Sequence, residues 1–288
     1  MRYFFHIGYH GFQYHGWQRQ LGAMSVQEII EDALSSIFQD TITIVGCGRT
    51  DAQVSASQYF FHTEFKDEWD FDLKFRLNKL LPSGIAIFDI IPVEKNHHAR
   101  FDAVKRTYDY FIHTTKNPFI SQTSSFYQIE NLDLAKMKEA VNLLSNYSDY
   151  RFFCKSPDKH HSTICNVTHA QLFNYKNGEK IRFQITSNRF LKGMIRIIVG
   201  KLLEIGKGEC TIEEFENALK TTAPLKLIKP AYPQGLYLSK VTYPYLDMVP
   251  QMDFSTILQN NVDVVWENVT SPRPSPFQGE GVFKNQGI

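Results

Sequence analysis

The sequence has few cysteines, no long apolar run and almost no net charge. Its four cysteines lie far apart and form no CxxC pair or zinc-type spacing, which predicts buried free thiols in a reducing compartment. No segment reaches the roughly 20 apolar residues that span a membrane. The apolar run at the N-terminus is too short for a signal peptide. We therefore expect a cytoplasmic protein without a membrane segment.

The near balance of charge excludes a globally basic nucleic-acid binder, since 31 Lys and Arg face 30 Asp and Glu. Any nucleic-acid site must be local, with acidic residues placed elsewhere. Aromatic residues, in contrast, are abundant, with 23 Phe and 14 Tyr among 288 residues. They suit β-rich cores and also surfaces that stack on bases.

Apolar periodicity, capping boxes and turn signals predict a mixture of helices and strands. Helices are predicted over residues 26–38, 72–81, 134–145 and 190–205 and from 211 onward. Strands are predicted over residues 1–7, 41–46, 58–62, 85–91, 107–113, 168–175, 180–186 and 236–241, with a type I′ turn at Asn177-Gly178. This mixture predicts an α+β protein of two similar subdomains, 1–104 and 105–246. Residues 247–288 form an extension that is expected to be largely disordered, because its Pro- and Gly-rich end cannot form a core.

The segment Gly46–Ala52 (GCGRTDA) is the first candidate site. It follows a β-branched run and places one carboxylate, Asp51, in a tight loop. Asp51 has two interpretations at this point: a turn aspartate that bonds its own backbone, or a functional carboxylate on a loop held by a strand. Arg49 is equally open, as the partner of that carboxylate or as a surface charge.

A second candidate lies in the helix expected after Arg189. One stripe holds Arg189, Lys192, Gly193, Arg196 and Gly200. Glycine inside a helix costs about 1 kcal/mol relative to alanine, so something is expected to approach this face closely. Packing against a neighbouring strand explains the stripe. The favoured alternative, once Asp51 is considered, is an Arg196 available to a carboxylate or phosphate.

Three further features have less certain meanings. Tyr108 and Tyr110 share one face of their strand, and periodicity alone indicates that both are core aromatics. The loop over residues 8–20 interleaves aromatic, amide and cationic side chains, which suits either packing on its own sheet or contact with nucleotides. His97 and His98 are adjacent, but no third ligand is patterned nearby, so a metal site is not expected.

Together these pieces resemble the tRNA pseudouridine synthase A family. The resemblance rests on motifs in the family's order over residues 1–245: Gly16–Gln20 with Ser25–Glu28, Gly48–Ala52, His98–Phe101 with Arg106–Tyr110, Phe190–Gly200, and Gly235–Leu238. It implies two subdomains with mainly antiparallel sheets, joined around a central active-site cleft. It further implies a homodimer that isomerises uridine to pseudouridine in tRNA, on the 3′ side of the anticodon arm, without cofactor or metal.

The resemblance also implies roles for single residues. Asp51 is the implied nucleophile, which attacks either the uracil ring or the ribose C1′. Arg196 is implied to hold Asp51 by a salt bridge, and Tyr108 to lie against the target base. Arg49 is implied to contact the RNA and hold the target nucleotide out of its stack. Further substrate-binding cations are expected at Arg19 and Lys192.

The chain departs from the family pattern directly after Asp51. Gln53 stands where the family usually has glycine, and Ser55 where it usually has histidine. The chemistry is expected to survive because Asp51 is retained, while the target position or RNA class is left open. One alternative is a catalytically inactive RNA-binding or RNA-folding module, against which the joint retention of Asp51, Tyr108 and Arg196 argues. Another is a hydrolase that uses Asp51 on a small molecule, against which the aromatic and basic loops argue.

Overall fold

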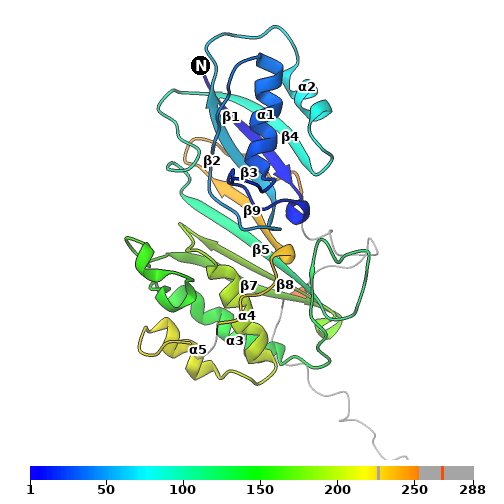
Figure 1. Ribbon diagram of the computed structural model, residues 1–288. Coiled ribbons are helices and arrows are strands. Elements are labelled where there is room, and N and C mark those ends of the chain that lie inside the picture. Colours follow the sequence, from blue (N-terminus) through cyan, green and yellow to red (C-terminus); the bar gives the residue numbers. More distant parts are fainter. Residues whose placement is uncertain (226–227, 253–266, 269–288) are drawn as a thin grey trace, which may run out of the picture.

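The computed structural model describes residues 1–225, 228–252 and 267–268 (Figure 1). The first half of the chain contributes β1 (Arg2–Tyr9), α1 (Val26–Phe38), β2 (Val45–Gly46), β3 (Ser55–Glu64), α2 (Leu73–Leu80) and β4 (Ile85–Val93). Helix α1 begins where the sequence predicts, because the Ser25 hydroxyl accepts the Glu28 N–H at 3.3 Å. Helix α2 is capped in the same way by Asp72, which accepts the Phe75 N–H at 2.9 Å.

The strand predicted over residues 41–46 is wrong for its first four residues, since only Val45 and Gly46 pair with β3. Upstream, side chains take the backbone donors that a strand would use. Ser35 Oγ accepts the Ile42 N–H at 3.0 Å, and Glu31 Oε1 accepts the Ile44 N–H at 3.1 Å. The segment is therefore extended but tied to α1, because its N–H groups are already satisfied.

The described part of the second half contributes six strands and three α-helices. These are β5 (Lys105–His113), β6 (Ser125–Phe126), α3 (Leu134–Leu143), β7 (Val167–Tyr175), β8 (Lys180–Ser187), α4 (Met194–Gly206), α5 (Ile212–Leu219), β9 (Leu236–Thr242) and β10 (Glu267–Asn268). Short 3-10 helices lie at Gly11–Gln13, Leu144–Asn146, Arg151–Phe153, Pro157–Lys159, Lys176–Gly178 and Pro233–Gly235. Helix α4 begins four residues later than predicted, after Gly193, whose φ of +75° is the left-handed conformation that favours glycine.

The hairpin of β7 and β8 is confirmed, and its turn at Asn177 (φ 53°, ψ 38°) and Gly178 (φ 95°) has the positive φ angles of the predicted type I′ turn, with the Glu179 N–H donating to the Lys176 carbonyl at 3.3 Å. Tyr175 pairs with Lys180, so four residues form the loop, and φ is positive at Lys176, Asn177 and Gly178. The Thr114 N–H donates to the Glu179 carbonyl at 3.0 Å, which draws the loop toward the end of β5. The turn therefore forms at the Asn-Gly pair, inside a loop of four residues rather than two.

The ten strands found among the described residues form one open sheet, and eight of them lie in the order β10-β7-β8-β5-β9-β3-β1-β4. Most pairs are antiparallel, but β9 pairs in parallel with β3 and antiparallel with β5 (Figure 1). This confirms the α+β prediction with a mainly antiparallel sheet. A strand from late in the sequence therefore joins the two halves beside the Asp51 loop, which leads into β3.

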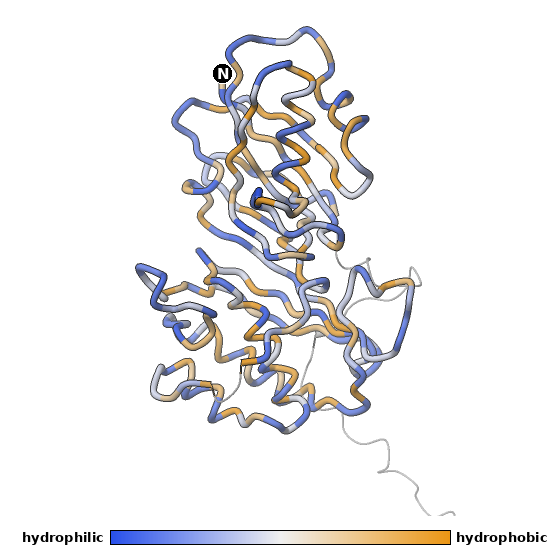
Figure 2. The backbone as a smooth tube through the Cα atoms, viewed as in Figure 1, coloured by the Kyte–Doolittle hydropathy of each residue, from blue (hydrophilic) through white to orange (hydrophobic). Residues whose placement is uncertain are grey.

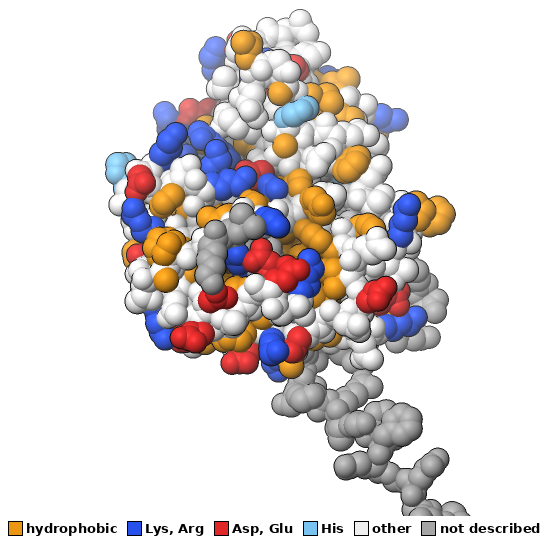
Figure 3. Space-filling view, turned by 60° about the horizontal axis from the view of Figure 1, so that its bottom comes forward, with side chains coloured by type: hydrophobic (Ala, Val, Ile, Leu, Met, Phe, Trp, Pro, Cys, Tyr) orange, Lys and Arg blue, Asp and Glu red, His pale blue; other side chains and the backbone are white. Residues whose placement is uncertain are grey.

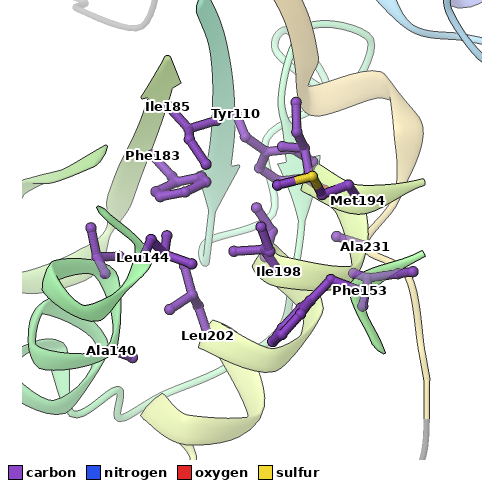
Figure 4. Packing of buried hydrophobic residues seen from close by; sticks show 14 of the residues in the cluster. Tyr110, Ala140, Leu144, Phe153, Phe183, Ile185, Met194, Ile198, Leu202 and Ala231 are labelled. Carbon is purple, nitrogen blue, oxygen red and sulfur yellow. The ribbon is translucent and has the colours of Figure 1, made fainter. Parts of the chain in front are cut away.

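Two large hydrophobic clusters hold the fold, one for each half of the sheet. In the second half, Ile198 and Leu202 of α4 pack in one cluster with Phe183 of β8 and Ala140 of α3 (Figure 4). The cluster of the first half includes Leu238 and Val241 from β9. Hydrophobic residues follow the packed strands and helices, and many outer loops are hydrophilic (Figure 2). The boundary predicted at 104–105 coincides with the entry into β5 and stays a prediction.

Cys47, Cys154 and Cys165 are buried, Cys210 is half-buried, and all four are free thiols. Within the part of the chain that the structure describes, no helix has the length and apolar character needed to cross a bilayer. Most of the extension 247–288, which is predicted to be largely disordered, lies outside the described residues. Within its described part, Glu267 and Asn268 form β10 against β7.

Candidate active site

The structure brings Asp51 and Arg196 together across 145 residues of sequence. Arg196 Nη1 lies 3.3 Å from Asp51 Oδ2. The Asp51 side chain is 37% exposed and that of Arg196 only 15%. The Asp51 carboxylate therefore remains accessible to a ligand. The Arg196 guanidinium is mostly shielded from water, so it attracts the carboxylate more strongly than a cation at the surface would.

Arg196 is itself held in place by the segment of residues 229–231. Its Nε donates to the Ala231 carbonyl at 2.6 Å, and the Ala231 N–H donates back to the Arg196 carbonyl at 2.8 Å. Gly200, one turn later, allows the Lys229 carbonyl to press directly against α4. The close approach predicted for this face is thus made by the chain's own backbone. Lys192 and Gly193, which the predicted stripe included, precede the helix.

The Asp51 loop rests on the loop of residues 8–20. The Gln53 N–H donates to the Tyr14 carbonyl at 3.0 Å, and the Trp17 N–H to the Thr50 carbonyl at 3.4 Å. The Thr50 hydroxyl also lies 2.8 Å from the hydroxyl of Tyr9. The early aromatic loop, for which packing and nucleotide contact were both open, therefore supports the backbone on either side of Asp51.

Arg106, to which sequence analysis assigned no role, holds three segments around the site. Its guanidinium donates to the carbonyls of Cys47 at 2.7 Å, Arg100 at 3.0 Å, Ala103 at 3.2 Å and Asn188 at 3.4 Å. The planar fork of arginine suits such divergent acceptors. The sequence feature that could have indicated a role for Arg106 is its position two residues before Tyr108, on the same face of β5.

Tyr108 and Tyr110, whose periodicity alone indicates that both are core aromatics, have different environments. Tyr110 is a core residue whose hydroxyl donates to Ser125 Oγ at 2.8 Å and to the Tyr232 carbonyl at 2.7 Å. Tyr108 is only half-buried, packs against both hydrophobic clusters and meets Phe190 edge to face at 5.1 Å. Burial raises the pKa of the Tyr108 hydroxyl, and the negative charge of Asp51 adds to this rise. The phenol therefore stays protonated at neutral pH.

The three other predicted site cations lie in different settings. Arg49 is exposed, and its Nε donates to Gln18 Oε1 at 3.1 Å. Arg19 is engaged with α1, where carboxylates of Glu28, Glu31 and Asp32 lie 3.6, 3.1 and 3.5 Å away. Lys192 is exposed next to the turn that opens α4. Arg49 thus lies on the Asp51 loop itself, whereas Arg19 is paired with carboxylates of α1.

The two departures from the family pattern are accommodated locally. Gln53 has a φ of +65°, a conformation that favours glycine and costs other residues about 1–2 kcal/mol. Ser55 is buried, and its hydroxyl accepts the Gly11 N–H at 2.9 Å. Neither side chain displaces Asp51 from Arg196.

Within the described residues, no three His, Cys, Asp or Glu side chains are grouped so that they could hold a metal ion. His97 stacks on Tyr245 with ring centres 3.7 Å apart. A surface pocket of about 450 Å³ is lined by residues of β1, α2 and β4, by the segment before α2 that includes Trp69, and by Met248, but by no residue of the Asp51 loop.

Comparisons with known proteins agree with this geometry. Residues 140–244 match the family model described as tRNA pseudouridine synthase. Proteins named tRNA pseudouridine synthase A from Azobacteroides pseudotrichonymphae and Parabacteroides distasonis are 38% and 39% identical to the chain, each over 84% of it and over 97% and 96% of their own lengths. One of that name from Clostridium kluyveri is 33% identical over 82% of the chain and 97% of its own length. The chain therefore belongs to the tRNA pseudouridine synthase A family, a family of isomerases.

Proposed function

We propose that this protein isomerises uridine to pseudouridine in tRNA, with Asp51 as the nucleophile. The observation that carries the proposal is the Asp51–Arg196 ion pair, in which an accessible carboxylate is paired with a shielded guanidinium. The half-buried Tyr108 ring lies near enough for the charge of Asp51 to influence its pKa. Family membership supports the same conclusion.

The reaction breaks the bond between C1′ and N1 and forms one between C1′ and C5 of the same base, while C5 loses its proton and N1 gains one. The Asp51 carboxylate attacks either the uracil ring or C1′, and it needs a fixed position for both routes. Arg196 supplies that position, because its second bond, to the Ala231 carbonyl, prevents the guanidinium from rotating freely. Tyr108 offers a ring for stacking and a protonated hydroxyl as a donor. No cofactor or metal is part of this proposal.

The proposed substrate contacts are the cations near the site. Arg49, on the Asp51 loop, is proposed to hold the flipped nucleotide out of its stack, and Lys192 to bind phosphate. Arg19 joins them only if RNA displaces it from its carboxylate partners. On the face drawn in Figure 3, several Lys and Arg side chains gather in one group, while others are scattered and Asp and Glu side chains lie both beside that group and elsewhere. A local group of cations suits a polyanion despite the net charge of +1.

The finer proposals concern target and assembly. We propose the 3′ side of the anticodon arm as the target and a homodimer as the active form, both of which follow from the family resemblance, and the cytoplasm as the location, which follows from the sequence. Mapping pseudouridine in cellular RNA with and without this protein tests the target. Sedimentation tests the assembly.

The central experiment measures pseudouridine by mass spectrometry in tRNA incubated with the protein. Asp51→Ala and Asp51→Asn are expected to abolish the product, because neither provides a carboxylate. Arg196→Lys is expected to reduce turnover far more than tRNA affinity, since an ammonium cannot bond Asp51 and Ala231 in the same geometry. Product formed equally by Asp51→Ala refutes the assignment of Asp51. Equal losses of turnover and affinity in Arg196→Lys would make Arg196 a phosphate contact.

A catalytically inactive RNA-binding module is the second candidate, motivated by Gln53 and Ser55. The structure offers it little support, because both residues fit without disturbing the ion pair. Tight tRNA binding without any pseudouridine, by freshly prepared wild-type protein, would favour it.

A further inference from the structure

One large aromatic ring is left uncovered beside the Asp51 loop. Phe101 is 74% exposed in the turn that precedes β5. The Arg100 guanidinium carbon lies 5.6 Å from the centre of its ring, and the His98 ring lies 4.3 Å away. An exposed ring with an exposed cation next to it is a combination that favours contact with a nucleobase and its phosphate.

The turn that carries Phe101 is held unusually firmly for a surface loop. The His98 N–H donates to Asp102 Oδ2 at 2.7 Å, and the Phe101 N–H to His98 Nδ1 at 3.3 Å. The Ala99 carbonyl accepts the Tyr243 hydroxyl at 2.6 Å. The backbone below the ring is therefore already ordered, and a ligand that stacks on it loses little conformational freedom.

The same turn is tied directly to the base of the Asp51 loop. Arg106 Nη2 donates to the Arg100 carbonyl at 3.0 Å and to the Cys47 carbonyl at 2.7 Å. One guanidinium thus connects the backbone beside Phe101 with the loop that ends in Asp51. An RNA strand whose target nucleotide reaches Asp51 must continue over neighbouring surface, and Phe101 is an exposed ring fixed to that loop.

We propose that Phe101 stacks on an unpaired base of the RNA substrate next to the target nucleotide, with Arg100 on the adjoining phosphate. This inference rests on the proposed RNA substrate but not on the role of Asp51. Phe101 acts in binding alone, because no reacting atom is assigned to it.

The test measures the affinity of an unmodified tRNA transcript for the Asp51→Ala protein, so that turnover does not interfere. Phe101→Ala is expected to weaken binding about 5- to 150-fold, the range for one lost base stack. Phe101→Ala should leave the salt dependence of binding unchanged. Arg100→Gln should make the negative slope of the logarithm of the association constant against the logarithm of salt concentration shallower by about one. The matched control is Phe75→Ala on α2, at the far end of the N-terminal half (Figure 1). Phe75 is 60% exposed, and Lys79 lies 5.6 Å from its ring.

A second readout does not depend on affinity. Phe101→Trp should bind tRNA as the parent does, and its added fluorescence should be quenched by the stacked base, while Phe75→Trp shows no quenching. Equal affinities for Phe101→Ala and Phe75→Ala, or an unquenched Phe101→Trp in the saturated complex, overturn the inference and leave the proposed function intact. Failure of the parent protein to bind tRNA at all refutes the proposed function instead.

Discussion

Replacement of Gly200 by alanine should destabilise the protein and misplace Arg196, even though alanine is the better helix former. A Cβ built at Gly200 lies less than 3.0 Å from the Lys229 carbonyl oxygen and 3.3 Å from the Lys229 carbonyl carbon. These are backbone atoms, so rotation of a side chain cannot relieve the overlap. The segment of residues 229–231 must move away from α4, and it carries the carbonyl that orients Arg196.

The expected magnitude follows from three opposing contributions. Alanine gains about 1 kcal/mol in helix propensity. Overpacking costs about 1–3 kcal/mol. Weakening the two bonds between Arg196 and Ala231 costs about 1–2 kcal/mol more. The net loss in the free energy of unfolding is therefore about 2 kcal/mol, or about 4–8 °C in Tm for a domain of this size. A shift of the guanidinium also reduces kcat, by about tenfold to a hundredfold.

Chemical denaturation and pseudouridine formation per folded molecule measure the two effects separately. Gly206→Ala, in the same helix, is the matched control. Its Cβ meets the ends of side chains, Met137 Sδ at 2.7 Å and Leu132 Cδ2 at 2.8 Å, which are able to yield. It should therefore stay active and lose less than about 1 kcal/mol. A Gly200→Ala protein that is more stable than the parent would refute the packing argument. One that is less stable but fully active would show that residues 229–231 do not position Arg196.

Three other perturbations have defined outcomes. Arg106→Lys should lower the free energy of unfolding by about 2–3 kcal/mol and reduce kcat more than tRNA affinity, because an ammonium cannot reach four carbonyls in three segments. Denaturation and steady-state kinetics test this, and a variant with unchanged stability and kcat contradicts it. Burial lowers the pKa of His62 from 6.5 to about 4, and its Nδ1 accepts the Ala99 N–H. The unfolded chain therefore binds that proton at a higher pH than the folded protein, so the free energy of unfolding falls as pH drops from about 6.5 toward 4. Urea titrations at several pH values should show a weaker dependence of the free energy of unfolding on pH for His62→Gln than for the parent. An unchanged pH dependence argues against this assignment. A thiol reagent should label Cys210 first in the native protein, because the other three cysteines are buried and burial raises the pKa of Cys47 to about 11. Peptide mapping gives the order of labelling, and early modification of Cys47 contradicts it.

The sequence predicted local elements well where the deciding interactions are themselves local. Helix α1 was predicted with its correct bounds because the cap at Ser25 and the apolar spacing both lie within it. The strand prediction for Thr41 to Ile44 was wrong because β-branched residues indicate an extended backbone but do not indicate which group its N–H donors bond. Its donors bond to side chains of Ser35 and Glu31.

The candidate site was harder to predict, since its parts are distant in sequence. Pattern alone left Asp51 undecided between a turn residue and a nucleophile, and the family resemblance paired it with Arg196. No local signal reports that Arg106 connects Cys47 to Asn188, because carbonyl acceptors carry no residue identity. The parallel pairing of Ser55 with Tyr237 is equally invisible to periodicity.

The position of β9 limits how early the two halves of this protein can finish folding during synthesis. Leu238 and Val241 belong to the cluster that α1 and β1 also form, and β9 covers the edge of β3. The first half of the chain therefore emerges with one strand edge unpaired and its core open, and it stays so while more than 130 intervening residues are made. Synthesis must pass Thr242 before both cores close, so the Asp51 loop acquires its final support among the last steps of folding.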